Sequence, residues 1–394
     1  MKWRNLLVIY EHLTHFIRIF WIKIKKILLI RSPRCRLLAI EKIYKTCIKE
    51  MKKMKVALIG ITGYGGMVLY QMLKTHPGID QVDLYARHLS GPTPLNQLVP
   101  NLFDDQPVYP YDSQKILAND GAVFFATPAG VTKTAARPYL TAHFPVIDLS
   151  GDYRLKNGAT YEKWYHQSPA ATADLKVAHY GLTDFCDATD ENLIANPGCY
   201  ATATLLGLAP LIINQLIDLD TIVVDAKSGT SGAGKKPTSS THFTQVNENA
   251  QLYNVNHHKH IPEIVQQLQA WDPAVDAIQF STTLLPITRG ILATIYAKPK
   301  PGVNKDQVVA AFKQTYATDP FVRYTGENLP TIKQVVGTNY CDLGVLFNER
   351  ANTIMVASVI DNLIKGAGGQ AIQNFNQRFN FAPTAGLPTA PLLP

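Results

Sequence analysis

The stretch that decides the fold is Lys55-Val56-Ala57-Leu58-Ile59-Gly60-Ile61-Thr62-Gly63-Tyr64-Gly65-Gly66. It begins with a short apolar run typical of a buried strand, passes through glycines at every third position, and enters a segment with helical spacing of apolar side chains. Such glycines let the backbone turn tightly and approach a pyrophosphate that rests on the N-terminus of the helix. The stretch therefore predicts a dinucleotide-binding domain, and a glycine-rich turn without a ligand is the alternative.

The next expected strand, residues 81–86, indicates which dinucleotide binds. An NAD site usually ends this strand with an acidic residue that binds the ribose 2′-hydroxyl group. Here Ala86 is followed by Arg87 and His88, which suit a 2′-phosphate better, although Asp83 lies earlier on the strand. We therefore expect NADP, and a solvated loop cation is the alternative reading of Arg87. The loop residues expected to contact the cofactor are Gly60, Thr62, Gly63, Tyr64, Gly65 and Gly66.

Apolar runs farther along the chain predict two kinds of sheet. Short runs that extend a parallel sheet are 121–126, 145–149 and 192–195. Longer β-rich runs that follow are 221–226, 277–286, 291–298 and 353–360. The predicted fold class is α/β, with a Rossmann-type parallel-sheet domain and an α+β catalytic and dimerisation domain that has a mixed, largely antiparallel sheet.

We expect an NADP-binding domain at residues 54–198 and a catalytic domain at residues 199–360. Residues 361–394 are expected to form a helix that returns to the NADP-binding domain, followed by a tail. Because this tail is rich in proline from Pro383, we expect it to be disordered or loosely draped.

The net charge of +8 comes from the N-terminal segment. Residues 1–53 contain 14 Lys and Arg and 3 Glu, so the rest of the 394-residue chain carries −3. This mildly acidic body, and a composition of 46% hydrophobic and 17% charged residues over the whole chain, indicate an ordinary globular protein without a nucleic-acid module. Five cysteines without a paired spacing favour reduced, cytoplasmic chemistry.

The apolar part of the N-terminal segment matches no membrane or targeting signal. Charged residues divide it into runs too short to span a bilayer: Glu11, Arg18, Lys23, Lys25 and Lys26. It also lacks the clean apolar block of a secretory signal and the serine content of a transit peptide. We expect residues 1–53 to lie outside the native fold, with translation starting at Met51 or Met54, and a membrane-surface anchor is the alternative.

The stretch Asn196-Pro197-Gly198-Cys199-Tyr200 places a thiol between a strand-like run and a helix-like run. A cysteine at a helix N-terminus lies at the positive end of the helix dipole, which lowers its pKa and favours the thiolate. We therefore expect Cys199 to be a nucleophile. The alternative is a small buried apolar residue that follows a turn.

A second candidate segment is His257-His258-Lys259-His260-Ile261-Pro262-Glu263, which precedes an amphipathic helix. A histidine titrates near neutral pH, so His258 could act as a general base and acid toward the thiol, with Glu263 orienting it. The spacing matches no zinc site, so we expect no metal. Surface histidines that cap a helix are the alternative.

Taken in order, these motifs resemble the N-acetyl-gamma-glutamyl-phosphate reductase family (type 1), which comprises NADP-dependent enzymes of arginine biosynthesis. The resemblance covers the chain from about Lys55 to about Gln377. Besides the glycine, cysteine and histidine motifs, it is carried by DLSGDYR (148–154), DAKSGTSGAG (225–234), GTNYCD (337–342) and DNLIKGA (361–367). The chain departs from the family pattern at Gly65, where a Thr hydroxyl is lost, and at Lys259, the middle of a His-Arg-His motif.

The resemblance implies reduction of N-acetyl-L-glutamyl 5-phosphate to the 5-semialdehyde through a thioester on Cys199, with hydride from NADPH. It makes His258 the candidate base and acid, with His260 and Glu263 assisting. Because the substrate has two anionic ends, we expect Arg289 at the α-carboxylate and Arg154 or Lys227 at the phosphate. Each of these cations could instead form a structural ion pair. Further predicted cofactor contacts are Ser228, Gly229 and Asn362.

Other functions share parts of this pattern. The rivals are aspartate-semialdehyde dehydrogenase, a carrier-protein-linked aminoadipyl-phosphate reductase, a non-catalytic NADP-sensing regulator and a membrane-anchored interaction protein. Enzymes of this architecture are usually homo-oligomers, so we expect a dimer or tetramer with no nucleic-acid partner and no stable membrane span.

Overall fold

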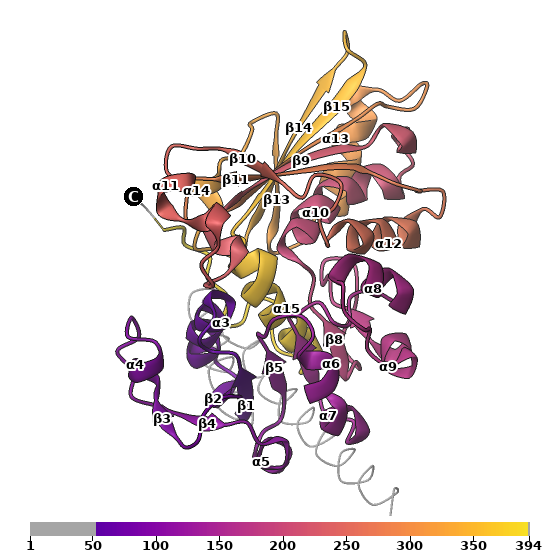
Figure 1. Ribbon diagram of the computed structural model, residues 1–394. Helices are drawn as coiled ribbons and strands as arrows, with labels where there is room; N and C mark the ends of the chain where they lie inside the picture. The colour runs from indigo at the N-terminus through magenta and orange to yellow at the C-terminus, as the bar shows by residue number, and fades with distance from the viewer. Residues whose placement is uncertain (1–52, 393–394) are drawn as a thin grey trace, which may run out of the picture. The chain divides into compact units, whose positions relative to one another are not determined.

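The computed structural model describes residues 53–392 (Figure 1). The predictions made for residues 1–52 lie outside this range. The described chain contains two sheets, one of eight strands and one of seven.

The first sheet has the order β3-β4-β2-β1-β5-β6-β8-β7. All neighbouring pairs are parallel except β3 and β4, and β1 occupies the centre between β2 and β5. The strands are β1 Met54–Ile59, β2 Ile79–Ala86, β3 Thr93–Pro94, β4 Pro107–Pro110, β5 Val123–Phe125, β6 Val146–Asp148, β7 His179–Tyr180 and β8 Leu193–Ala195. From β1 the chain continues to β2 on one side, and it later reaches β5 on the opposite side of β1. Such a reversal of strand order creates the crevice where α/β sheets bind ligands.

Helices cover both faces of the first sheet. On one face lie α3 (Tyr64–Thr75), the π-helical turn η4 (Ile364–Gly368) and α15 (Gly369–Arg378). On the other lie α5 (Ser113–Asn119), α7 (Arg137–Thr141) and α9 (Thr172–Val177). The shorter helices of this part are α4 Leu95–Leu98, α6 Thr132–Ala135 and α8 Gly158–Tyr165. Cover on both faces explains why the central strands read as continuous apolar runs.

The second sheet has the order β10-β11-β9-β12-β15-β14-β13. The pairs β9–β11 and β13–β14 are parallel and the other pairs are antiparallel. The strands are β9 Val223–Gly229, β10 Gln251–Tyr253, β11 Gln279–Leu285, β12 Ile291–Ala297, β13 Val322–Gly326, β14 Cys341–Asn348 and β15 Thr353–Ile360. The predicted fold class, a parallel sheet followed by a mixed and largely antiparallel one, is confirmed.

One face of the second sheet packs against α10 (Cys199–Ile213), α12 (Ile261–Trp271) and α13 (Lys305–Thr315). Helix α10 is buried on all sides from Tyr200 to Ile212, because it lies between the sheet and the other two helices. That position explains why its sequence is apolar all round rather than amphipathic. The remaining short helices are α11 Phe243–Val246, α14 Ile332–Val335, η1 Leu219–Thr221, η2 Thr230–Ala233 and η3 Ser239–Thr241.

The tail from Pro383 is packed against the protein, so the expectation of a disordered end is wrong. The backbone N–H of Asn339 donates to the Pro388 carbonyl, and the N–H of Leu392 donates to the Val336 carbonyl, both at 2.9 Å. The Asn376 amide also donates to the carbonyls of Pro383 and Ala385. Proline removes backbone donors but leaves carbonyls free to accept, and two of these bonds use the carbonyls of Pro383 and Pro388.

A buried ion pair joins η4 to the loop after β7. The Lys365 ammonium donates to both carboxylate oxygens of Asp184, at 2.8 and 3.0 Å, and to the Gln373 side chain at 2.8 Å. Both charged side chains have no exposed surface. A pair of this kind is costly to break, because one uncompensated charge then stays in the interior.

We predict that Lys365→Met lowers the free energy of unfolding by about 3–5 kcal/mol, because it leaves the Asp184 carboxylate buried and unpaired. The double variant Lys365→Met/Asp184→Asn should recover most of the loss, since neither side chain is then charged. Urea unfolding of the three proteins measures this, and a single variant as stable as the double would contradict it.

Candidate active site

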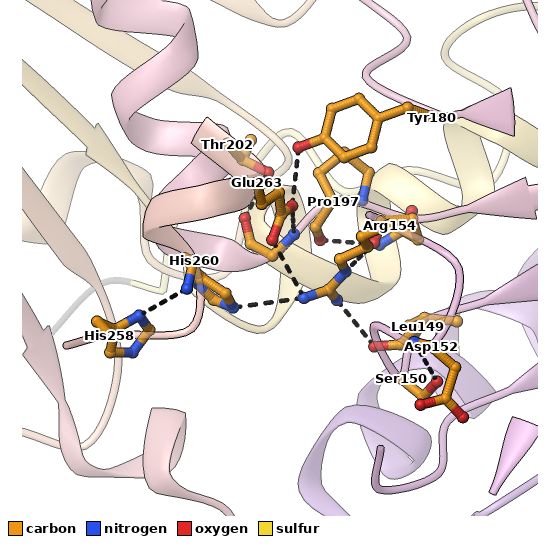
Figure 2. Close-up of polar contacts among 12 residues, drawn as sticks. Leu149, Ser150, Asp152, Arg154, Tyr180, Pro197, Thr202, His258, His260 and Glu263 are labelled. Carbon is orange, nitrogen blue, oxygen red and sulfur yellow. Dashed lines mark hydrogen bonds and ion pairs between the residues drawn. The ribbon is translucent and has the colours of Figure 1, made fainter. Parts of the chain in front are cut away.

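The end of β8 delivers Cys199 to the N-terminus of α10. Strand β8 ends at Ala195, the turn Asn196-Pro197-Gly198 follows, and Gly198 is the N-cap of the helix that starts at Cys199. The backbone N–H of Gly198 donates to Glu263 Oε1 at 2.7 Å (Figure 2). The turn that carries the cysteine is therefore tied directly to the first turn of α12.

Glu263 is buried and is the centre of the site's hydrogen bonds. Besides Gly198, its carboxylate accepts from the Tyr180 hydroxyl at 2.7 Å and lies 3.5 Å from a terminal nitrogen of Arg154. These contacts place Glu263, a predicted site residue, beside the turn that carries Cys199, where it acts as an anchor. Tyr180, which ends β7, was not predicted, because nothing in the sequence relates it to the histidine segment.

Arg154 is almost wholly buried, and its donors are occupied by protein groups. Its Nε donates to the Asn196 carbonyl at 2.8 Å, and one terminal nitrogen donates to the Leu149 carbonyl at 3.0 Å. The other terminal nitrogen faces Glu263 and lies 3.3 Å from His260 Nε2. Burial lowers the pKa of Arg154, but Glu263 together with Tyr165, Tyr180 and Asp148 more than offsets this, so the guanidinium stays charged.

The two predicted histidines lie side by side with ring centroids 4.7 Å apart. Burial and then Lys259 lower the pKa of His258 to about 3, and burial holds the pKa of His260 well below its usual value. Both rings are therefore neutral near neutral pH. His258 Nδ1 accepts the backbone N–H of His260 at 3.1 Å, which leaves the proton of the neutral ring on Nε2.

This tautomer makes His258 Nε2 a hydrogen-bond donor at the start of a reaction. It suits the predicted role of general acid, whereas accepting the thiol proton would require the other tautomer. Tyr200 packs edge-on against the His258 ring, with the ring centroids 5.2 Å apart, and its hydroxyl lies 2.8 Å from that of Tyr253. These two tyrosines were missed by sequence reasoning, since Tyr253 belongs to a separate strand.

Cys199 is half-buried, and burial raises the pKa of its thiol. Arg154, the Tyr200 backbone N–H and Lys259 act in the opposite direction without fully offsetting it. The predicted lowering of this pKa is therefore wrong in the described structure, because desolvation of the thiolate outweighs the helix N-terminus and the nearby cations.

We predict that alkylation of Cys199 by iodoacetamide rises with pH along a curve whose midpoint lies above about 8.5, the ordinary thiol value. The sign follows because a raised pKa reduces the thiolate fraction near neutral pH. The rate is measured as the difference from Cys199→Ser, which retains the other cysteines. A midpoint below the ordinary value would contradict the conclusion that burial outweighs the nearby cations in setting the pKa of Cys199.

Asp152 of the segment 148–154 holds the loop that follows β5, and Asp148 is buried beside it. Asp152 accepts the backbone N–H groups of Gly130 and Lys133, at 2.7 and 3.0 Å, and the Tyr161 hydroxyl at 2.7 Å. Burial and then Asp152 raise the pKa of Asp148 to about 6. The motif at 148–154 contributed to the family resemblance, but a role was predicted only for Arg154, so both carboxylates were missed.

The glycine loop fits a dinucleotide. Gly60 has φ +101°, and a Cβ there would overlap the Ala126 carbonyl of the loop after β5, while a Cβ at Gly66 would overlap the Gly60 carbonyl. Helix α3 has Gly63 as its N-cap, no side-chain cap and no acidic residue in its first turn. Its first N–H groups are therefore available to a pyrophosphate. Thr62, Tyr64 and Gly65 lie in the same loop and first turn.

The other predicted cofactor residues fall into two places. Arg87 directly follows β2, at the carboxyl edge of the sheet, and is exposed. Ser228 and Gly229 end β9. The Asn362 amide donates to the Ser231 hydroxyl at 3.0 Å and accepts the Gly290 N–H at 2.8 Å. Asn362 therefore connects the segments after β9 and before β12 to the start of η4. Contacts of all these residues with a cofactor stay predictions.

Two of the predicted substrate cations are paired with acids. Lys227 contacts the carboxylate of Asp225 on the same strand. Arg289 lies 3.0 Å from the Asp361 carboxylate, which is fully buried. Binding of the substrate α-carboxylate by Arg289 and of the phosphate by Lys227 or Arg154 stays a prediction. Of the predicted substrate cations, Arg154 is the one that the structure brings into the hydrogen-bonded cluster with His260 and Glu263.

Within residues 53–392 no cluster of His, Cys, Asp and Glu could hold a metal ion. Over the same part of the chain, no helix combines the length and apolar character needed to cross a bilayer.

Two family models match the chain in succession. Residues 55–197 match the semialdehyde dehydrogenase NAD binding domain, and residues 199–362 match the semialdehyde dehydrogenase dimerisation domain. The predicted nicotinamide-dinucleotide domain therefore agrees with the family model.

Curated relatives match over most of the chain. N-acetyl-gamma-glutamyl-phosphate reductase of Limosilactobacillus fermentum is 99% identical over 341 residues, which cover 86% of this chain and 100% of that protein. N-acetyl-gamma-glutamyl-phosphate reductase 2 of Lactiplantibacillus plantarum is 54% identical over 343 residues, with the same coverage of 86% and 100%.

Solved structures share the fold at much lower identity. Aspartate semialdehyde dehydrogenase II of Vibrio cholerae, complexed with ASA, has a TM-score of 0.61 at 17% identity, covering 83% of this chain and 98% of that one. Aspartate semialdehyde dehydrogenase of Candida albicans with NADP has a TM-score of 0.60 at 14% identity, covering 84% and 99%. At this identity the likeness concerns the fold alone.

Proposed function

This chain belongs to the N-acetyl-gamma-glutamyl-phosphate reductase family, and from that premise we propose that it reduces N-acetyl-L-glutamyl 5-phosphate to N-acetyl-L-glutamate 5-semialdehyde with NADPH, in arginine biosynthesis. The observation that carries the proposal is the hydrogen-bonded placement of Glu263, Arg154 and the histidines around the turn that holds Cys199. That arrangement serves a cysteine nucleophile attacking an acyl group.

Cys199 reacts as the thiolate. Its sulfur forms a bond to the acyl carbon, the bond from that carbon to the phosphate oxygen breaks, and the departing phosphate takes up the proton that the thiol gave up to form the thiolate. Arg154 and the Tyr200 N–H favour the thiolate, which partly offsets its burial. The product of this step is a thioester on the enzyme.

When bound, NADPH supplies a hydride to the thioester carbonyl carbon. The residues of the glycine loop and Arg87 bind and orient the dinucleotide, with Arg87 at the 2′-phosphate. His258 Nε2–H is suited to donate to the carbonyl oxygen as negative charge develops there. Collapse of the alkoxide reforms the C=O bond, breaks the C–S bond and returns the thiolate.

Glu263 and His260 position these groups. Because Glu263 binds the Gly198 N–H and the Arg154 guanidinium, it fixes the nucleophile's turn against a cation. His260 binds Arg154 through Nε2 and supports His258 through its backbone N–H. Neither residue needs to exchange a proton with substrate in this scheme.

The rival functions are separated by substrate. Aspartate-semialdehyde dehydrogenases share the fold with this chain at 14–20% identity, whereas the acetylglutamyl reductases reach 54% and 99%. A carrier-linked aminoadipyl enzyme would need its carrier protein for turnover, and a regulator would bind NADP without turnover. The cytoplasm is the proposed location, which the three free cysteines of the described region support: Cys186, Cys199 and Cys341.

We predict phosphate-dependent reduction of NADP by N-acetyl-glutamate 5-semialdehyde, followed as the absorbance of the reduced nicotinamide. Aspartate semialdehyde should react far more slowly, and no carrier protein should be required. Cys199→Ser should lower kcat by at least about 1,000-fold while NADP still binds, because only the nucleophile is lost. A preference for aspartate semialdehyde, or NADP binding without turnover in the unsubstituted protein, would favour a rival.

The chain is also proposed to act as a homo-oligomer through the second sheet. On the face opposite α10, α12 and α13, neighbouring strands align an apolar row of Val223, Tyr296, Met355 and Leu346. Val223 and Tyr296 are 37% and 39% exposed. An apolar row across four strands that leaves two of its side chains exposed is suited to the same face of a second copy.

We predict that Tyr296→Asp shifts the protein to a smaller mass in size-exclusion chromatography with light scattering, because a carboxylate would be buried between two copies. Phe103→Asp is the matched control, since Phe103 is fully exposed (101%) on the first domain. Equal masses for Tyr296→Asp and the unsubstituted protein would contradict the assigned face.

A further inference from the structure

The acyl-phosphate substrate brings a phosphate to Cys199, yet the three cations predicted to bind the substrate are engaged with protein groups. Lys227 is paired with Asp225, and Arg289 is paired with Asp361. Arg154 donates to backbone carbonyls and to Glu263 from a position with 6% of its side chain exposed. A phosphate would have to displace protein partners at Arg154, and at Lys227 and Arg289 it would compete with a carboxylate for the cation.

Lys259 differs from these three cations in its exposure and in having no acidic partner among the described residues. It lies between the two site histidines, it is exposed, and no ion pair involves it among residues 53–392. Its ammonium lies 5.8 Å from the centre of the Tyr165 ring, at the end of α8. Its two chain neighbours lie against the turn of Cys199: a Cβ at Gly198 would overlap the His260 ring, and the His258 ring packs edge-on against Tyr200. Its charge acts in addition on the Cys199 thiol and on Arg154.

From this placement we infer that Lys259 binds the phosphate of the acyl-phosphate substrate and, in the reverse direction, inorganic phosphate. The inference deepens the proposed function and rests on it. In the reverse step a phosphate oxygen bonds to the thioester carbonyl carbon, the C–S bond breaks and sulfur leaves as the thiolate. Lys259 touches the attacking phosphate and is therefore a catalytic residue.

The electrostatics of the site support this role. Although the residue is exposed, burial among protein atoms and then Arg154 lower the pKa of the Lys259 ammonium. A phosphate dianion beside it would favour the charged form again through a charge-assisted hydrogen bond. A flexible ammonium is a point charge that can follow the phosphate as it leaves, whereas Arg154 is fixed by its hydrogen bonds.

The test is the KM for inorganic phosphate in the reverse reaction, with saturating N-acetyl-glutamate 5-semialdehyde and NADP. Lys259→Gln should raise this KM about tenfold or more, the effect of losing one charge-assisted hydrogen bond, while the KM values for the semialdehyde and NADP stay within about twofold. Lys259→Arg, which keeps the charge, should stay within about threefold of the unsubstituted protein. Lys176→Gln, at an exposed lysine of α9, is the matched control and should change nothing.

A second measurement separates phosphate binding from a general effect on the thiol. The pH dependence of Cys199 alkylation in Lys259→Gln reports how much the lost charge shifts the thiol. If that curve moves and kcat falls while the phosphate KM is unchanged, Lys259 acts only on Cys199 and the inference is overturned. It is also overturned if Lys227→Gln, rather than Lys259→Gln, raises the phosphate KM.

Failure of the proposed function gives a different result. If the unsubstituted protein shows no phosphate-dependent turnover with the acetylated semialdehyde, both the function and the inference are wrong. If it turns over normally and only Lys259→Gln fails to change the phosphate KM, the function stands and the inference alone is wrong.

Discussion

The bond from the Gly198 N–H to the Glu263 carboxylate is the contact on which the rest of the site depends. It connects the end of the first sheet to the first turn of a helix that packs on the second, so the turn that carries Cys199 is fixed by both halves of the described chain. The same carboxylate neutralises Arg154, and Arg154 in turn orients His260. A buried carboxylate is tolerated here because each of its contacts offsets part of its desolvation cost.

Burial also determines where protons lie in the site. It keeps both histidines neutral and makes the thiolate costly, so the free site holds fewer charges than its residue types suggest. The persistent charges are the Glu263–Arg154 pair and the exposed Lys259. An anionic substrate therefore enters a site in which one unpaired cation lies near an otherwise balanced cluster, which favours approach with the phosphate toward that cation.

Much of this was predictable from the sequence because the signals are local. The glycine loop, the turn before Cys199 and the segment from His258 to Glu263 each carry their geometry in consecutive residues. The pKa of Cys199 was not predictable, because it depends on how much protein surrounds the thiol. Tyr180 and Asp152 were missed for a related reason: their roles arise from partners brought together only by the fold. The docked tail was missed because composition reports the lost N–H donors of proline and not the acceptors that remain.

The helical elements that cover one face of the first sheet lie far apart in the sequence, and this has a consequence for folding during synthesis. Strands β1 to β8 are complete by Ala195, but η4 and α15, which close one face, begin only at Ile364. During synthesis α3 is, of the three elements that cover that face, the one available while the whole second sheet is made, and the cover is completed only after nearly all of the chain has left the ribosome. The nucleotide-binding half, although first in sequence, is therefore the last to finish folding, and its unfinished apolar face is the stage most exposed to aggregation.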